Sequence, residues 1–222
     1  MPDIAFLFDM DGVIVDSNPF HKISLIQFVR KYGFDFTEQQ LKEKVFGRTN
    51  GEWLTNLFGP MPSARLREMA EEKEKLFREM YARDVKPVPG LISFLEKLEQ
   101  QKFPKAIATS APSSNVEFTL DGTGTRRFFK TILDDSFIIL SKPNPEIYLK
   151  AAAALKMPPE KCIVIEDSLS GLEAGRAAGC KIVGITTTHS PEELVHADCV
   201  IEDFIDLDPM TLIKNTGILK TA

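Results

Sequence analysis

The chain has 222 residues, which is enough for one large domain or for one domain that carries a smaller insert. Apolar residues make up 43% and charged residues 27%, as in an ordinary globular protein, so a disordered or fibrous chain is excluded. The net charge of −5 argues against bulk affinity for nucleic acid, whose phosphate backbone attracts net-basic surfaces.

No apolar run reaches the roughly 18 residues that cross a membrane. The N-terminus also lacks a basic region followed by an apolar stretch. Cys162, Cys180 and Cys199 are far apart and show neither metal-binding nor redox spacing, so they are interpreted as reduced thiols. We therefore expect a cytoplasmic monomer that binds neither nucleic acid nor a membrane.

Short apolar runs recur along the chain and predict β-strands. They lie at residues 4–8, 106–109, 131–133, 163–165, 182–185 and 199–201. Helix-like segments follow several of these runs, and strands alternating with helices indicate an α/β fold with a parallel sheet covered on both faces. In such sheets the active site lies at the carboxyl ends of the strands, so the residues that follow each run are of most interest.

One region interrupts the alternation of strands and helices. It contains amphipathic stretches in which apolar residues recur at helical spacing, for example at Leu25, Phe28 and Tyr32. We expect residues 17–85 to form a helical domain inserted after the first strand. Residues 1–16 and 86–222 would then form the domain that contains the sheet.

Two acids follow the first predicted strand, in the run Asp9-Met10-Asp11-Gly12. Close carboxylates repel each other, so this arrangement is costly unless a proton or a cation relieves it. Magnesium, a hard cation with oxygen ligands, would do so. The further acidic ligands of a calcium-binding loop are absent, and an ordinary turn remains an alternative interpretation of these residues alone.

Acids and hydroxyls also follow two other predicted strands, and one lysine lies in a separate loop. The groups are Thr109-Ser110-Ala111, Ser141-Lys142-Pro143 and Glu166-Asp167-Ser168. Together with Asp9 and Asp11 they supply what phosphoryl transfer requires. These requirements are a nucleophile, a metal site, hydrogen-bond donors to the phosphoryl oxygens, and an acid for the leaving group.

At this point the sequence resembles the haloacid dehalogenase superfamily, in its β-phosphoglucomutase-like phosphatase branch. Four motifs occur in the family order: Phe-Asp-Met-Asp-Gly-Val, Ala-Thr-Ser-Ala, Ser-Lys-Pro-Asn-Pro and Val-Ile-Glu-Asp-Ser-Leu-Ser-Gly. They span nearly the whole chain. The resemblance implies a Rossmann-like core domain and a helical cap domain, which corresponds to the predicted insert.

The resemblance also implies catalytic roles. Asp9 would attack phosphorus and form an aspartyl phosphate. Asp11 would protonate the leaving oxygen and then deprotonate the acceptor that attacks the intermediate. Lys142 would neutralise charge on Asp9 and the phosphoryl group, and Thr109 would hydrogen-bond the phosphoryl oxygens together with Ser110 and Ala111.

The same resemblance implies a magnesium site formed by Asp9, the main-chain carbonyl of Asp11, and Asp167, with Glu166 as a ligand or as support. Simpler roles also fit the residue types. Thr109 could cap a helix, Asp167 could be an N-terminal helix charge, and Lys142 could be a solvated loop residue.

Substrate choice is expected to depend on the inserted domain, because the core would bind only phosphate and metal. His21 and Lys73 lie on otherwise apolar helix faces, and the resemblance assigns both to the substrate site; a hydrogen-bonded histidine and a partly solvated lysine are the alternatives. Arg48 and Asn50 lie in a polar loop that could bind substrate hydroxyls or a second phosphate. The mutase has an arginine where this chain has Asn50, which weakens the case for a second phosphate.

We therefore predict a magnesium-dependent phosphatase of small sugar or metabolite phosphates that acts through an aspartyl phosphate. A β-phosphoglucomutase-type phosphomutase is the main alternative. An inorganic pyrophosphatase, a dehalogenase, a phospho-acceptor signalling domain and a non-catalytic binding protein are less favoured.

Overall fold

The computed structural model describes residues 3–45 and 49–220. The chain folds into two compact units. The core unit comprises the residues up to Asp16 together with those from Val85 onward, and the inserted unit comprises Ser17–Asp84. Within the described parts of the chain, no helix combines the length and the apolar character needed to cross a membrane.

The core unit contains a six-stranded sheet in the order β3-β2-β1-β4-β5-β6, in which all neighbouring strands are parallel. The strands are β1 (Ala5–Phe8), β2 (Lys105–Ala108), β3 (Thr131–Leu133), β4 (Cys162–Glu166), β5 (Lys181–Ile185) and β6 (Cys199–Ile201). Each apolar run that predicted a strand overlaps one of them, to within one residue at either end. The predicted α/β, Rossmann-like fold is confirmed.

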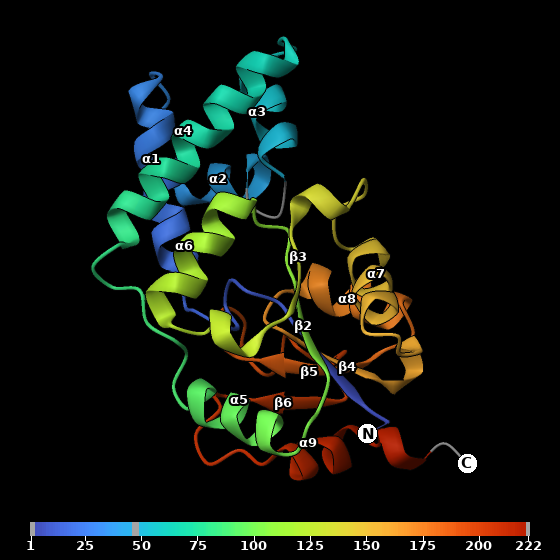
Figure 1. The fold of residues 1–222 in the computed structure, drawn as a ribbon. Coiled ribbons are helices and arrows are strands. Elements are labelled where there is room, and N and C mark those ends of the chain that lie inside the picture. The colour runs from blue at the N-terminus through green and yellow to red at the C-terminus, as the bar shows by residue number, and fades with distance from the viewer. Residues whose placement is uncertain (1–2, 46–48, 221–222) are drawn as a thin grey trace. The chain divides into compact units, whose positions relative to one another are not determined.

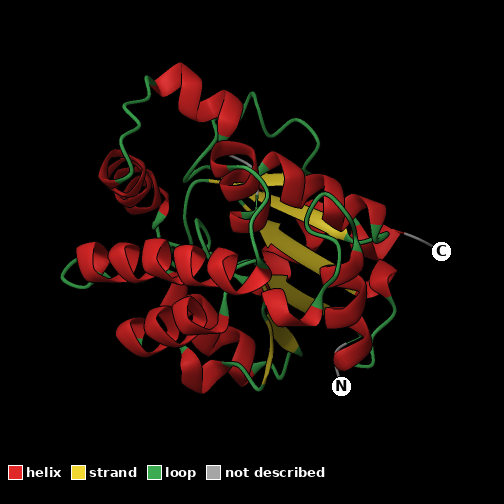
Figure 2. Cartoon of the chain, turned by 90° about the horizontal axis from the view of Figure 1, so that it is seen from above, coloured by secondary structure: helices red, strands yellow, loops and turns green. Residues whose placement is uncertain are grey.

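Helices cover both faces of this sheet (Figures 1 and 2). They are α5 (Leu91–Gln100), α6 (Ser113–Thr123), α7 (Glu146–Ala154), α8 (Leu169–Ala177) and α9 (Pro209–Thr216), with short 3₁₀ turns η1 (Arg126–Phe128), η2 (Asp135–Phe137), η3 (Pro159–Lys161) and η4 (Ile218–Lys220). α7 packs against β1, β2 and β3, while α8 packs against β4 and β5. α5 and α9 pack against each other, and Figure 1 shows this pair apart from α7 and α8.

Strand β1 contributes to the apolar layers on both faces of the sheet. Ala5 and Leu7 belong to a buried cluster with side chains of α7 and α8. Phe6 and Phe8 point to the other face, because side chains alternate along a strand. There they contact Phe94 of α5 at ring-centroid distances of 6.0 and 6.4 Å. Burial on both faces explains the continuously apolar runs from which the strands were predicted.

The inserted unit is helical. Its helices are α1 (Asn18–Lys31), α2 (Glu38–Lys44), α3 (Asn50–Phe58) and α4 (Ser63–Tyr81). α4 packs against α1 and α3. Buried side chains such as Phe28, Trp53 and Met69 form the core of the inserted unit. α3 begins at a capping box in which Thr49 and Glu52 bind each other's backbone N–H groups.

The strand order determines where the acids and hydroxyls of the core unit lie. β1 is hydrogen-bonded to β2 on one side and to β4 on the other. The carboxyl ends of these three parallel strands therefore lie side by side. The chain leaves them at Asp9, Thr109 and Asp167, which brings three of the predicted groups to one edge of the sheet.

Candidate active site

Asp9 follows β1 directly and is only 7% exposed. Its backbone N–H donates to the carbonyl of Ile165 at 3.1 Å, which extends the pairing with β4. The chain then turns: the N–H of Gly12 donates to the carbonyl of Val15 at 2.7 Å. Asp11, within the turn, is half-buried.

Gly12 is required at this turn for two reasons. Its φ of +79° is in the left-handed region, which side chains disfavour. A Cβ at this position would also lie 2.0 Å from Oδ2 of Asp167, so any side chain would displace that carboxylate. The glycine therefore allows the turn after β1 to approach the acid at the end of β4.

Glu166 is fully buried at the end of β4 and accepts five hydrogen bonds. Oε1 accepts from Nζ of Lys142 at 2.5 Å and from the hydroxyl of Tyr148 at 2.7 Å. Oε2 accepts from the backbone N–H groups of Asp167 and Ser168 and from Oγ of Ser168, each at 3.0 Å. This carboxylate is thus held in place and joins the lysine loop to the start of α8.

Lys142 connects the carboxylates that follow two different strands. Its Nζ lies 2.6 Å from Oδ1 of Asp9 and 2.5 Å from Oε1 of Glu166, and 5.0 Å from the ring centre of Tyr148. Burial alone would lower the pKa of Lys142, but the two carboxylates raise it above its ordinary value. The lysine therefore stays charged, and it lowers the pKa of Glu166 although burial opposes this.

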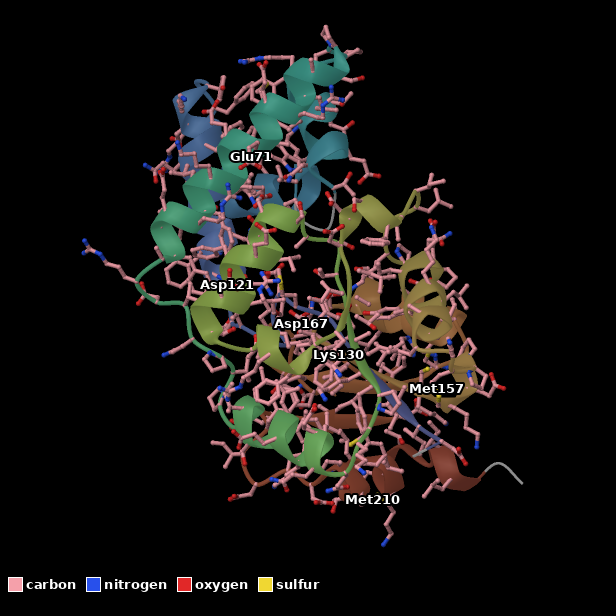
Figure 3. The ribbon with its side chains drawn as sticks, viewed as in Figure 1. Glu71, Asp121, Lys130, Met157, Asp167 and Met210 are labelled. Atoms are coloured by element: carbon pink, nitrogen blue, oxygen red, sulfur yellow. The ribbon has the colours of Figure 1, made fainter. Side chains whose placement is uncertain are left out.

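One ammonium does not balance the acids in this cluster. Burial raises the pKa of Asp9 from 3.8 to about 7, although Lys142 opposes the change. Burial, followed by the charges of Glu166 and Asp9, raises the pKa of Asp167 well above its ordinary value. Asp167 is 3% exposed and is labelled in Figure 3. Three carboxyl groups share one lysine, so ionising all three would place an excess of negative charge in a buried site.

These residues fit a hard divalent cation. Asp9, Glu166 and Asp167 each offer an oxygen, and these oxygens lie within 4.8 Å of one another. A divalent cation prefers carboxylate oxygens and would neutralise the excess charge. Glu166 already accepts five hydrogen bonds, so Asp9 and Asp167 are better suited to direct contact with a metal.

The predicted phosphate-binding residues follow β2. Because Phe8 of β1 pairs with Ile107 of β2, Asp9 and Thr109 leave neighbouring strand ends. Thr109 is 1% exposed, and its Oγ1 accepts the N–H of Ala111 at 3.1 Å. Ser110 between them is exposed.

Three of the residues predicted in the insert form one cluster. Nζ of Lys73 lies 3.0 Å from Nδ1 of His21 and 3.0 Å from Oε1 of Glu74. The same Glu74 oxygen accepts from Nδ2 of Asn50 at 2.7 Å. Oδ1 of Asn50 in turn accepts from Nε1 of Trp53 at 3.0 Å. Arg48, the fourth predicted residue, lies outside the described residues.

Three residues that make hydrogen bonds within these clusters were not predicted from the sequence. Tyr148 binds Glu166, Thr188 donates to Oδ2 of Asp167, and Glu74 joins Lys73 to Asn50. Thr188 could have been found, because it follows β5, the strand next to β4, at the same edge of the sheet. The polar group of a buried tyrosine usually finds a partner, but the sequence does not indicate which one.

Comparison with known proteins shows the family to which the chain is similar. The sequence profile of the haloacid dehalogenase-like hydrolases matches residues 6–185. A phosphorylated carbohydrates phosphatase of Thermotoga maritima is 32% identical over 82% of this chain and 84% of its own. Hexitol phosphatase A of Escherichia coli is 28% identical over 95% and 94%. The β-phosphoglucomutase structure from Clostridium difficile is 26% identical, covers 99% of both chains and has a TM-score of 0.84.

Proposed function

We propose that this chain, which belongs to the haloacid dehalogenase-like hydrolase family, is a magnesium-dependent phosphatase of small sugar or metabolite phosphates. The observation that carries the proposal is the buried cluster in which Lys142 joins Asp9 to Glu166 beside Asp167. The predicted β-phosphoglucomutase-like branch of the family is confirmed by the phosphatase relatives and by the structural similarity to the mutase.

The proposed reaction has two displacements at phosphorus. A carboxylate oxygen of Asp9 forms a bond to phosphorus while the ester P–O bond breaks, and Asp11 gives its proton to the leaving oxygen. Water then attacks phosphorus, the bond to Asp9 breaks, and Asp11 takes the proton of the water. Lys142, held against Asp9 at 2.6 Å, would favour the ionised form of that carboxylate and orient it.

Asp9, Asp167 and the main-chain carbonyl of Asp11 would hold Mg²⁺, which when bound shares the negative charge of the phosphoryl group. We propose that Glu166 supports the site rather than binding the metal, because its two oxygens already accept five hydrogen bonds. Thr109, Ser110 and Ala111 would bind the phosphoryl oxygens with their hydroxyl and N–H groups.

The inserted unit would bind the rest of the substrate through His21, Lys73 and Asn50, and through Arg48. Glu74 supports a phosphatase rather than a mutase. It places a buried carboxylate against Lys73 and Asn50, so this cluster suits neutral sugar hydroxyls better than a second phosphate. The mutase alternative is supported by the overall similarity to β-phosphoglucomutase, and transfer to a sugar hydroxyl would need the same Asp9 and Asp11.

Phosphate release from p-nitrophenyl phosphate, with and without magnesium, tests the proposed chemistry. Activity should require magnesium and disappear in Asp9→Asn, while Asp3→Asn, at an exposed position, should keep it. A panel of hexose, hexitol and nucleoside phosphates and pyrophosphate then identifies the substrate class. Turnover of β-glucose 1-phosphate to the 6-phosphate with a trace of the bisphosphate would favour the mutase. No hydrolysis of any ester by the wild-type chain with magnesium would refute the proposal.

A further inference from the structure

The segment at residues 137–140 begins at the last residue of η2 and ends directly before the loop that carries Lys142. Three of its four side chains are exposed, with Phe137 50%, Leu140 56% and Ile139 89% exposed, while the partly buried Ile138 packs against the apolar cluster of the core unit. Apart from Ile138, packing of these side chains contributes little to fixing the segment, although Lys142 needs a defined backbone position. The backbone of the segment is also held by polar side chains of α7.

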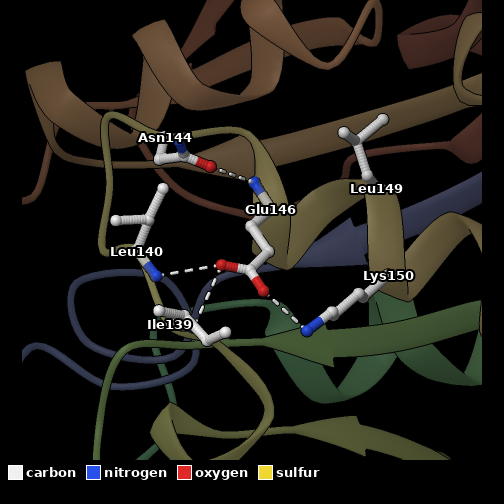
Figure 4. Close-up of a pocket in the computed structure, with 6 residues that line it drawn as sticks. All are labelled: Ile139, Leu140, Asn144, Glu146, Leu149 and Lys150. Atoms are coloured by element: carbon white, nitrogen blue, oxygen red, sulfur yellow. Dashed lines mark hydrogen bonds and ion pairs between the residues drawn. The ribbon is translucent and has the colours of Figure 1, made fainter.

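Glu146, at the start of α7, makes most of these contacts (Figure 4). Oε2 accepts the N–H of Ile139 at 3.0 Å and the N–H of Leu140 at 2.9 Å. Oε1 accepts from Nζ of Lys150, one helical turn later, at 2.6 Å. The same Nζ also donates to the carbonyl of Phe137 at 2.6 Å. One ion pair on α7 thus binds three backbone groups of the segment.

The contacts of Glu146 are strong for a partly exposed side chain. Hydrogen bonds to an ionised acceptor are stronger than bonds between neutral groups. Lys150, followed by the two backbone N–H groups, lowers the pKa of Glu146 from 4.5 to about 2. The carboxylate therefore stays ionised at any pH at which the protein would be assayed. The N–H of Glu146 itself donates to Oδ1 of Asn144 at 3.0 Å, which fixes the start of the helix.

The same helix also holds the side chain of Lys142. The ring of Tyr148 lies 5.0 Å from Nζ of Lys142, and its hydroxyl binds the Glu166 oxygen that Lys142 also binds. α7 therefore contacts the lysine loop at two places: Glu146 binds the backbone before it, and Tyr148 lies against the ammonium. A lysine has a flexible four-carbon stem, so the position of its backbone limits where the ammonium can reach.

We infer that Glu146 is a positioning residue for Lys142, acting through the backbone of residues 137–140. The importance of Lys142 for turnover rests on the proposed phosphatase function, whereas its position in the fold does not. Loss of the Glu146 carboxylate frees the segment, and Lys142 then spends less time between Asp9 and Glu166. Glutamine at this position keeps an oxygen that can accept both N–H groups, so it should preserve the function.

Chemical labelling tests the position of Lys142 without any substrate. Acetic anhydride treatment of the whole chain, mapped by mass spectrometry, compares Lys142, whose side chain is 8% exposed, with Lys75, which is 69% exposed. In Glu146→Ala, Lys142 should be acylated at least about tenfold faster than in the wild type, relative to Lys75. Glu146→Gln should stay near the wild-type rate. Asp121→Ala, which removes an exposed ion pair to Arg126, is the matched control and should leave the rate unchanged.

An unchanged Lys142 rate in Glu146→Ala, or an equal increase in Asp121→Ala, would overturn the inference. If Glu146→Ala does not fold, Lys150→Met replaces it, because it removes the bond to the Phe137 carbonyl and the partner of Glu146. Faster acylation of Lys142 in that variant supports the inference, and the wild-type rate overturns it.

Kinetics with p-nitrophenyl phosphate and magnesium provide the second readout. Glu146→Ala should lower kcat by roughly 10- to 100-fold, the size of effect expected when a catalytic group is misplaced by about 1 Å. KM should change by less than about threefold, because the lost interaction acts on the attacking carboxylate and not on substrate binding. Glu146→Gln should restore most of kcat; a glutamine variant as slow as the alanine variant would overturn the inference. An inactive wild type would refute the proposed function alone, since the labelling result stands without it.

Discussion

The metal-free protein is expected to lose stability as the pH rises from 5 to 8, and magnesium should oppose this loss. The reason is the excess of buried carboxylates around Lys142. Asp9 has its pKa raised from 3.8 to about 7, chiefly by burial. Asp167 shifts in the same direction. A bound cation would favour the ionised forms and reverse both shifts.

The sign and the size follow from the pKa of Asp9. Between pH 3.8 and about 7 the folded chain keeps a proton that the unfolded chain releases, so stability is greatest below this window and is lost as the pH rises through it. From pH 5 to about 7 the change spans about two pKa units, or about 2.7 kcal/mol. Glu166 acts in the opposite direction, but its pKa is lowered from 4.5, so its contribution is complete by pH 5.

Urea unfolding followed by far-UV circular dichroism at pH 5, 6, 7 and 8, with EDTA or with magnesium, measures the effect. The gain in stability from magnesium should increase with pH and level off above about pH 7. Asp9→Asn should flatten the pH dependence in EDTA, whereas Asp3→Asn should not. A metal-free protein whose stability rises from pH 5 to 8, or a magnesium effect of equal size at all four values, would refute this account of the cluster.

Three substitutions test individual contacts of the cluster. Lys142→Met leaves two buried carboxylates without their cation and should cost about 3–5 kcal/mol in urea unfolding at pH 7; a loss under about 1 kcal/mol would contradict the described pairing. Gly12→Ala, whose methyl would meet Asp167 at 2.0 Å, should weaken magnesium binding by at least about tenfold in calorimetry. Gly33→Ala has a similar positive φ and no described atom within 4 Å of the new Cβ, so it should bind magnesium normally. Thr188→Val should weaken binding by about tenfold and Thr188→Ser should not; equal affinities would show that the bond to Asp167 is unimportant.

The sheet could be predicted because each strand is marked by a short run of apolar residues that are adjacent in the sequence. Buried parallel strands need apolar side chains on both faces, so Phe6 and Leu7 are alike in polarity although they face opposite layers. The rule that functional groups follow the strands then directed attention to Asp9, Thr109 and Asp167. The structure brings these residues to neighbouring strand ends, and their catalytic roles stay predictions.

Other contacts that hold the site together, such as those of Tyr148 and Glu74, are not local, and the sequence did not indicate them. Tyr148 lies on a helix whose apolar pattern shows only that its ring is buried, while its hydroxyl binds Glu166, 18 residues away. Glu74 sits next to Lys73 in sequence and looks like one of many surface acids on a charged helix, yet it is 4% exposed. Partners of buried polar groups depend on how helices pack, which residue types and spacing do not encode.

The only tryptophan of the chain gives the inserted unit its own optical signal. Trp53 is 2% exposed, meets the ring of Phe28 edge-on and donates its indole N–H to Asn50. Its emission therefore reports on the inserted unit alone, while circular dichroism reports on the whole chain. Through Asn50 the indole is also linked to Glu74 and Lys73, so a ligand that binds this cluster should shift the emission without any label. Titrating the unlabelled protein with sugar phosphates can thus reveal binding. The same titration works for a variant that no longer hydrolyses them.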